Sequence, residues 1–518
     1  MSILSMNKTV QRVAIALVLF AAYVTAHEHH PVEEIDPQVP IDGYIYFHGA
    51  LQTFLWGISF PIGMVLGLSK SKYHVPLQAT NTVLVFVGMY FGHHHGGRQY
   101  PETVHGLMAK IITWILVTQA GLGIFLKLHV MEKSVRPWVV PFHSFLGKIF
   151  PVLGWTQMLF GVATALGFCR DGNLGQCAAH YIMGSAFIGY AAIMVIMLQV
   201  GHKWLERTGR SQEMLDSSVI MVWGIINTFT EHHGGPWSHK DMQHTMMGVL
   251  WWAGGLLGIF LSRNGKRSFV PAVIIIMTGW GMSAHEQALM ISSKIHALFG
   301  YALIAAGVLR LVEVCFVLND KPTPAGTVRI FQHLPPYLLT LGGTLFMSAT
   351  DEEMRNADGL GIDHVSYALF DFSLSFLLYL IIAFLVHLYS NSGKNALQSN
   401  EGNANLNAEE AGYSKIGSEN VGRRGVGGEY GLDEDDGPEA YELSDRDIGF
   451  DADGHNSRND RQRPRAGGSA SGSGSGSGSA SDEGKVGGED EIDWIDPASN
   501  HNRGAGGQRR GLQGGVRL

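Results

Sequence analysis

The sequence predicts an all-α, polytopic membrane protein: a bundle of about eleven transmembrane helices followed by a disordered cytosolic tail. The chain has 518 residues, 46% of them hydrophobic, and the apolar residues gather in runs of roughly 17–25, the length that crosses a bilayer. The acidic residues behind the net charge of -8 concentrate after residue 400. The net negative charge therefore comes from the tail and not from the apolar part of the chain. We expect membrane lipid as a partner and no nucleic acid, because no basic patch is present.

The N-terminal residues predict a cleaved signal peptide over residues 1–26. Lys8 and Arg12 precede a short apolar run, and Val24-Thr25-Ala26 has the small residues of a cleavage site. A retained signal anchor is the alternative. A short lumenal segment over 27–43 comes next. The eleven apolar segments then cover 44–68, 74–92, 103–126, 139–166, 179–200, 216–230, 244–262, 268–284, 294–318, 331–349 and 365–390.

These segments are grouped into a first module, 44–200, and a second module, 201–390. With a lumenal mature N-terminus, the loops rich in Lys and Arg all face the cytosol, so the positive-inside rule predicts this orientation. The Gly/Ser-rich, acidic residues 391–518 offer few apolar side chains to bury, which predicts a disordered cytosolic tail. We expect an integral membrane protein of the secretory pathway, the vacuole or the plasma membrane. Cys169 and Cys177 share one predicted lumenal loop, which favours a disulfide over two free thiols.

Each of the first four apolar segments carries a histidine near its N-terminal end, namely His48, His74, His105 and His143. Because successive spans run in opposite directions, His48 and His105 are predicted at the lumenal face and the other two at the cytosolic face. Ionisable side chains inside a bilayer need polar partners. Two such pairs would give bis-imidazole ligation of two b-type haems stacked across the membrane. The alternative is four interfacial anchors or hydrogen-bond donors between helices.

Neighbouring residues suit haem ligation. Gly49 and Gly106 directly follow histidines, and a flat macrocycle can approach a backbone that lacks Cβ atoms. Lys110 and Lys148 each lie five residues after a histidine and could meet a haem propionate. Snorkelling of these lysines to the interface is the alternative. A hydrocarbon core of ~30 Å leaves roughly 20 Å between the two sites, a distance suited to electron transfer.

The first four segments contain the stretches FHGALQTFLWGISFPIG, YHVPLQATNTVLVFVGMYFG, VHGLMAKIITWILVTQAGLGI and PFHSFLGKIFPVLGWTQMLFGV. These stretches resemble the core helices of the cytochrome b561 class, di-haem electron carriers of eukaryotic membranes that are usually reduced by ascorbate. The resemblance covers about residues 44–166 and implies a histidine on each helix, with the first paired to the third and the second to the fourth. Across residues 27–390 the chain is more similar to the fungal Ytp-type membrane proteins, which join such a module to a C-terminal multispanning module.

A second group of histidines is predicted at the lumenal face. It consists of His232, His233, His239 and His244 in or beside the loop 229–245, with His285 and His296 at the ends of later spans. Imidazole together with carboxylate suits iron, copper or zinc, so these residues are candidate metal ligands. The alternative is a hydrated loop with a polar network between spans. The acidic segment 350–364 is interpreted as a solvated loop, because its oxygens do not follow EF-hand spacing.

The sequence therefore predicts transmembrane electron transfer through two b-type haems, from a cytosolic donor such as ascorbate to a lumenal acceptor. A ferric or cupric ion would make the protein a metal reductase. Two alternatives stay open: a metal-ion transporter or sensor that uses the lumenal histidines without haem, and a structural membrane protein without redox activity.

Overall fold

The computed structural model describes residues 39–129, 131–230, 236–284, 287–319, 321 and 328–396. The predicted signal peptide, 1–26, and residues 397–518 of the predicted tail lie outside these residues, as do His232, His233 and His285. The described residues contain helices and no strand, which confirms the predicted all-α class.

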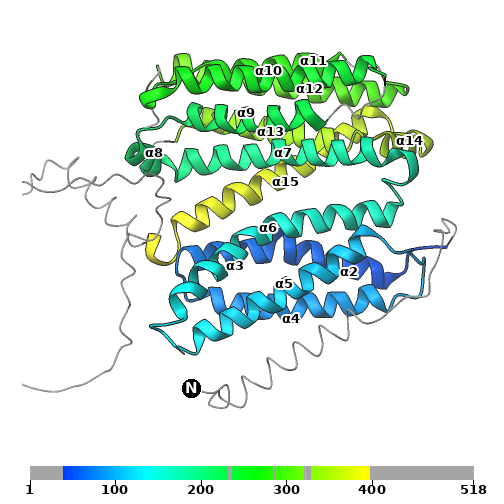
Figure 1. Cartoon of the computed structure of the whole chain (residues 1–518). Helices are drawn as coiled ribbons and strands as arrows, with labels where there is room; N and C mark the ends of the chain where they lie inside the picture. The colour runs from blue at the N-terminus through cyan, green and yellow to red at the C-terminus, as the bar shows by residue number, and fades with distance from the viewer. Residues whose placement is uncertain are drawn as a thin grey trace, which may run out of the picture. The chain divides into compact units, whose positions relative to one another are not determined.

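The helices fall into two groups (Figure 1). The first comprises α2 (Gly43–Phe54), the π-helical segment η2 (Leu55–Ser59), α3 (Phe60–Leu68), α4 (His74–His93), α5 (Val104–Lys127) and α6 (Arg136–Leu166). The second comprises α7 (Leu174–Gln199), α8 (His202–Thr208), α9 (Gln212–Thr230), α10 (His239–Leu261), α11 (Val270–Ser283), α12 (Met290–Val312), η5 (Glu313–Val317), η6 (Ile330–His333), α13 (Leu334–Met347), α14 (Asp351–Gly359) and α15 (His364–Ser390).

Short polar residues begin several of these helices. The side chain of Asp42 accepts a hydrogen bond from the Ile45 amide at 3.0 Å at the start of α2, and Thr103 accepts one from Gly106 at 3.3 Å at the start of α5. Ser238 and Asp241 form a capping box at the start of α10. Such caps satisfy amide groups that the helix itself leaves without partners.

All eleven predicted apolar segments contain a helix, and eight of the described helices are long and apolar enough to cross a membrane. The other three segments correspond to α9, α11 and α13. α11 and α13 each have 14 residues, while α9 has 19 residues but carries Glu213 and Asp216 in its first two turns. The polytopic all-α membrane fold is thus confirmed, with eight candidate spans by length and composition and three further apolar helices.

The fifth span packs with the later helices. The apolar pattern predicts a first module over residues 44–200, whereas α7 packs along α13 and also contacts α15. Gly184 and Gly343 make this possible, because a Cβ atom on Gly184 would lie 2.6 Å from the Gly343 carbonyl oxygen. Small residues permit such close approach of helices in membranes.

α15 joins the two groups. It contacts α3 of the first group and α7 and α13 of the second, and Figure 1 shows it running between them. Just beyond its end, the Lys394 amide donates to the Ser69 carbonyl oxygen at 2.8 Å, and the hydroxyls of Ser69 and Ser392 are 2.7 Å apart. The final helix therefore returns the chain to the loop before α4.

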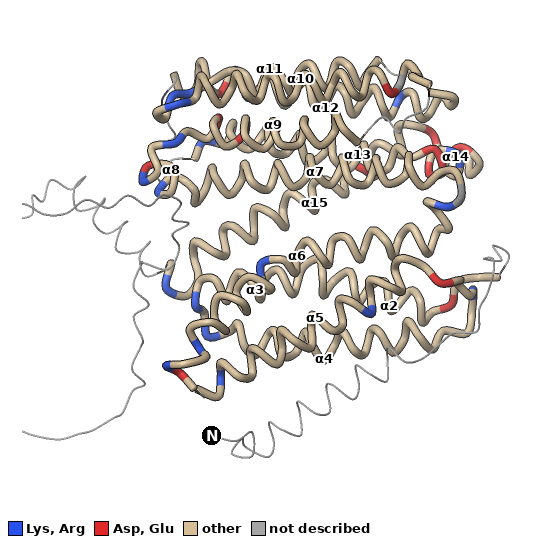
Figure 2. The backbone as a smooth tube through the Cα atoms, viewed as in Figure 1, with Lys and Arg blue, Asp and Glu red and all other residues tan. Residues whose placement is uncertain are grey.

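Lys and Arg gather near one end of the helices, which includes α8 and the loops before α4 and α6 (Figure 2). The loops at this end are the ones predicted to face the cytosol. The distribution agrees with the positive-inside rule, while the orientation itself stays a prediction.

A buried ionic network lies at the same end of the second group. Arg310 pairs with Glu213 at 2.8 Å and with Glu313 at 2.7 Å, while Arg267 reaches Glu213 at 2.7 Å. Gln332 donates to Glu313 at 3.0 Å. Every one of these side chains is at least nine-tenths buried. The network connects α9, α12 and the loop before α11 through paired charges that are buried away from water.

Candidate functional site

The first four spans bring their histidines together in two pairs. The ring centres of His48 and His105 are 6.2 Å apart with an interplanar angle of 86°, and those of His74 and His143 are 6.3 Å apart at 84°. These are the pairs that chain direction predicts, one at each end of the bundle. Two imidazoles that share one metal ion have ring centres roughly 6 Å apart, because each metal–nitrogen bond is about 2 Å.

Backbone carbonyl groups of neighbouring helices hold these rings. Nδ1 of His48 donates to the Gly88 carbonyl oxygen at 2.8 Å, and Nδ1 of His74 donates to that of Gly63 at 2.7 Å. With Nδ1 donating, Nε2 keeps its lone pair and can bind a metal. A carbonyl bond behind a metal-binding histidine is a common way of fixing the tautomer and the ring orientation.

The second helix pair repeats this arrangement with glutamines. Nδ1 of His105 lies 3.3 Å from the carbonyl oxygen of Gln157 and 3.0 Å from its side-chain nitrogen. Gln119 donates from its side chain to the His143 carbonyl oxygen at 2.9 Å. Nδ1 of His143 is buried and has no hydrogen-bond partner among the described residues. The rings of His48, His74 and His105 are thus held by hydrogen bonds to the adjacent antiparallel helix, whereas the bond to His143 is made to its backbone.

A glycine of the adjacent helix lies against each ring. A Cβ atom on Gly92 would come within 2.5 Å of the His48 ring, and one on Gly67 within 2.8 Å of the His74 ring. The corresponding distances are 3.2 Å from Gly161 to His105 and 3.4 Å from Gly123 to His143. Each glycine lies four residues after the residue whose carbonyl or side chain serves the same histidine. These four glycines were not predicted as site residues.

The spacing along the chain could have revealed them. In α4, α5 and α6, the histidine is followed 14 residues later by Gly88, Gln119 or Gln157, and 18 residues later by a glycine. The first span has its corresponding glycines, Gly63 and Gly67, one residue later. The π-helical segment η2 lies between His48 and these glycines and accommodates one additional residue without changing the helix faces. The four spans therefore carry one repeated pattern.

An aromatic cluster separates the two histidine pairs near the middle of the bundle. The ring centre of Trp56 lies 4.7 Å from that of Phe60 and 5.6 Å from that of Phe150, and all three side chains are buried. Around them, α2 and α3 pack against α4, and α5 packs against α6, while the main contacts of α6 with the first of these helix pairs are to η2 and α3. The histidine pairs lie on either side of this cluster, between the two helix pairs.

Lys148 and Lys110, the candidate partners of a haem propionate, are both exposed side chains. A Cβ atom on Gly49 would meet no atom within 4 Å, and one on Gly106 would meet only the Thr103 hydroxyl, at 3.9 Å. The backbone beside His48 and His105 is therefore open, as a flat ligand would require.

The second histidine group is only partly described. His239 is exposed in the first turn of α10, His244 is half-buried one turn later, and His296 on α12 is 4% exposed. The ring of His296 lies 5.8 Å from that of His180 on α7, centre to centre. His180 was not predicted. It lies at the start of the fifth span, at the same membrane face as His296, and that shared position was the available signal.

The predicted disulfide between Cys169 and Cys177 is present, with Cα atoms 5.3 Å apart. Glu352 of α14 accepts hydrogen bonds from the Cys169 amide at 2.7 Å and from the Asn173 side chain at 3.3 Å. The interpretation of 350–364 as a solvated loop is therefore wrong for residues 351–359. Thr350 caps a helix there, and its acidic first turn suits the helix dipole.

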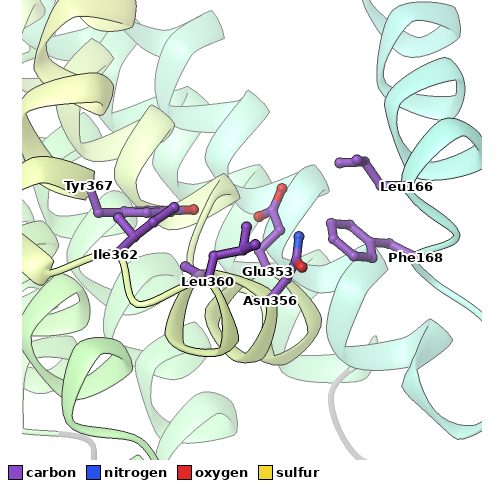
Figure 3. Close-up of a pocket in the computed structure, with 8 residues that line it drawn as sticks. Leu166, Phe168, Glu353, Asn356, Leu360, Ile362 and Tyr367 are labelled. Carbon is purple, nitrogen blue, oxygen red and sulfur yellow. The ribbon is translucent and has the colours of Figure 1, made fainter. Parts of the chain in front are cut away.

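A cavity of about 130 Å³ lies beside this helix. Figure 3 shows Glu353 between Tyr367 and Ile362 on one side and Leu166 and Phe168 on the other. Burial raises the pKa of Glu353 to about 7, and repulsion by Asp371 adds to the effect. The cavity is large enough for a few water molecules and too small for a macrocycle.

Together, the apolar helices, the loop charges and the paired histidines define a polytopic helical membrane protein with a four-helix histidine module at its N-terminal end. A family model described as "Protein YTP1-like, C-terminal" matches residues 153–390, and one described as a domain of unknown function (DUF2427) matches residues 28–129. Over these residues the chain is similar to the YTP1-like fungal membrane proteins.

Three relatives illustrate the match. Protein YTP1 of Saccharomyces cerevisiae is 42% identical over 278 residues, which cover 52% of this chain and 60% of YTP1. Uncharacterized membrane protein C3B8.06 of Schizosaccharomyces pombe is 23% identical over 423 residues, 56% of this chain and 83% of the relative. Uncharacterized membrane protein YCR061W of Saccharomyces cerevisiae is 27% identical over 289 residues, 46% of this chain and 45% of the relative.

The chain thus spans about 60% of the length of YTP1. No solved structure matches the chain at a significant level. None of the matching proteins is described as a cytochrome, so the resemblance of the first module to cytochrome b561 stays a prediction.

Proposed function

We propose that the protein transfers electrons across its membrane through two b-type haems, one held by His48 and His105 and the other by His74 and His143. The observation that carries the proposal is the spacing of the ring centres, 6.2 and 6.3 Å, in two pairs at opposite ends of one bundle. A b-type haem supplies one-electron chemistry whose potential depends on its axial ligands and surroundings.

The residues around each pair have distinct tasks in this proposal. The carbonyl groups of Gly88 and Gly63 fix the tautomers of His48 and His74, so that Nε2 is available. Gly92 and Gly67 allow each ring to lie directly against the neighbouring helix. Trp56 and the other buried aromatic rings exclude water from the space between the pairs, which keeps the local dielectric low.

The donor and acceptor follow from the predicted orientation. A cytosolic reductant such as ascorbate would act at the His74/His143 end, and a lumenal acceptor such as a ferric or cupric ion at the His48/His105 end. Polar anchors would not require the four rings to meet in two pairs with ring centres 6.2 and 6.3 Å apart, and for this reason we favour ligation over the anchor alternative.

The test is a reduced-minus-oxidised optical spectrum of the detergent-purified protein, with its haem content, for the wild type and four histidine variants. His48→Ala and His105→Ala should each remove the same one of two haems, and the double variant should lose no more than either. His74→Ala and His143→Ala should remove the other haem. His333→Ala is the matched control, because His333 is also half-buried and hydrogen-bonded, to Tyr379 at 2.8 Å.

A wild-type protein that folds but lacks low-spin b-type bands would overturn the proposal. So would a His48→Ala/His74→Ala variant that keeps full haem content. Retention of haem with no electron transfer in reconstituted vesicles would leave the haem sites standing and reject the electron-transfer function.

A further inference from the structure

A third pair of histidines lies in the second group of helices, outside the haem proposal. His180 on α7 and His296 on α12 have ring centres 5.8 Å apart at an interplanar angle of 80°. The Phe346 ring stacks on His180 at 4.6 Å. These three residues lie on α7, α12 and α13, and α13 packs against both α7 and α12.

Both rings are held by their own helices. Nδ1 of His180 donates to the Gln176 carbonyl oxygen at 2.8 Å, and Nδ1 of His296 donates to that of Ser292 at 2.9 Å. Each bond leaves the lone pair on Nε2. Nε2 of His180 is buried and has no hydrogen-bond partner among the described residues. A buried acceptor without a partner is costly, so this nitrogen calls for a ligand that it can bind.

The packing restricts the size of that ligand. Next to the pair, α7 and α13 are in backbone contact at Gly184 and Gly343, where an added Cβ atom would clash with the opposite helix. His180 is also covered by Phe346. Unlike the two pairs of the first group, which lie between separate helix pairs, this pair lies beside a close helix contact, which favours a single ion over a macrocycle as its ligand.

The two imidazoles of His180 and His296 are the donors at this site. Late first-row divalent metals favour such nitrogen donors.

We infer that His180 and His296 form a binding site for one late first-row divalent transition-metal ion, bound through Nε2 of both rings. The site is independent of the haem proposal. It lies at the end of the bundle where His48 and His105 also lie, since α2, α5, α7 and α12 all begin at that end. The ion is identified by its chemistry: borderline softness, a preference for imidazole, and a coordination number that a crowded helix interface can meet.

The test uses the full-length protein in detergent, stripped of metal and titrated with Zn²⁺ against a chromophoric chelator. The wild type should bind one tight equivalent, and His180→Ala and His296→Ala should each weaken that equivalent by more than about tenfold. His333→Ala should leave it unchanged. Persistence of the tight equivalent in a His180→Ala/His296→Ala variant would overturn the inference, and weaker binding at exposed histidines would be common to all variants.

A second variant gives a positive signal that a folding defect cannot imitate. In His296→Cys protein titrated with Co²⁺, a thiolate-to-cobalt charge-transfer band should appear, because Cys is also a ligand for such ions. His333→Cys protein should show no such band above the wild-type background. A monodisperse His296→Cys protein without the band would also overturn the inference.

Discussion

The ring of His48 lies against Gly92 of the next helix, at a place where even a methyl group on Gly92 would come within 2.5 Å of Nδ1. The same nitrogen donates to the carbonyl oxygen of Gly88, one turn earlier. The position of a candidate metal ligand is thus determined by the absence of a side chain on another helix.

Gly92→Ala should therefore displace His48 and break its 2.8 Å bond to Gly88. We expect the haem of the His48/His105 pair to be lost or weakly bound, with the other retained, as measured by the optical spectrum and haem content. Gly121→Ala is the control, because a Cβ atom there meets no atom within 4 Å. Equal effects of the two substitutions would contradict the packing argument.

The π-helical segment η2 predicts a contrast between two deletions. Removing Ile58, inside η2, should convert the segment to regular α-helix and keep His48, Gly63 and Gly67 on their present faces. Removing Val83 from the regular helix α4 should rotate His74 relative to Gly88 by about 100°. Haem content and size-exclusion profiles should be near wild type for the first deletion and defective for the second. The opposite order would refute the register explanation.

Arg310 should be required for the stability of the second group of helices. It balances two buried carboxylates, Glu213 and Glu313, at 2.8 and 2.7 Å. Arg310→Met leaves Glu313 without a charged partner and Glu213 with Arg267 alone, and we expect it to reduce the free energy of unfolding by about 3–5 kcal/mol. Thermal denaturation in detergent would measure this. Lys266→Met, at an exposed position near the same end, should change it by less than about 0.5 kcal/mol.

Glu353 should make stability depend on pH. Burial raises its pKa from 4.5 to about 7, so between these values the folded protein binds more protons than the unfolded protein. The contribution of Glu353 to the free energy of unfolding is fully present below about pH 4.5. It is lost as the pH rises through about 7, and the free energy of unfolding then falls by an amount on the order of 1–3 kcal/mol. Denaturation measured from pH 5 to 8 should show a smaller loss for Glu353→Gln than for the wild type. A parallel loss in both proteins would count against this assignment.

The sequence contained enough to pair the four histidines. Apolar run lengths located a helix in each of the eleven predicted segments, and alternation of direction assigned His48 to His105 and His74 to His143. The run lengths did not distinguish complete spans from α9, α11 and α13, because hydrophobicity marks a buried helix as readily as a lipid-facing one.

Other features depend on contacts between distant segments. The packing of α7 on α13 rests on Gly184 and Gly343, whose role becomes visible only when both helices are placed side by side. In the sequence, His180 is a single polar residue within an apolar run, and nothing near it in the chain indicates a partner. Its pairing with His296 needed the order in which the helices pack, which hydrophobic periodicity does not encode.

The return of α15 to α3 has a consequence for biosynthesis. At a translation rate of about 5–20 residues per second, the roughly 300 residues between these helices take on the order of 15–60 s to make. Throughout that interval, the nascent first four spans are in the membrane while the partner surface that covers α3 has not yet been translated. The module that is synthesised first is thus the last to be completed, and its assembly waits for the final helix to emerge from the ribosome.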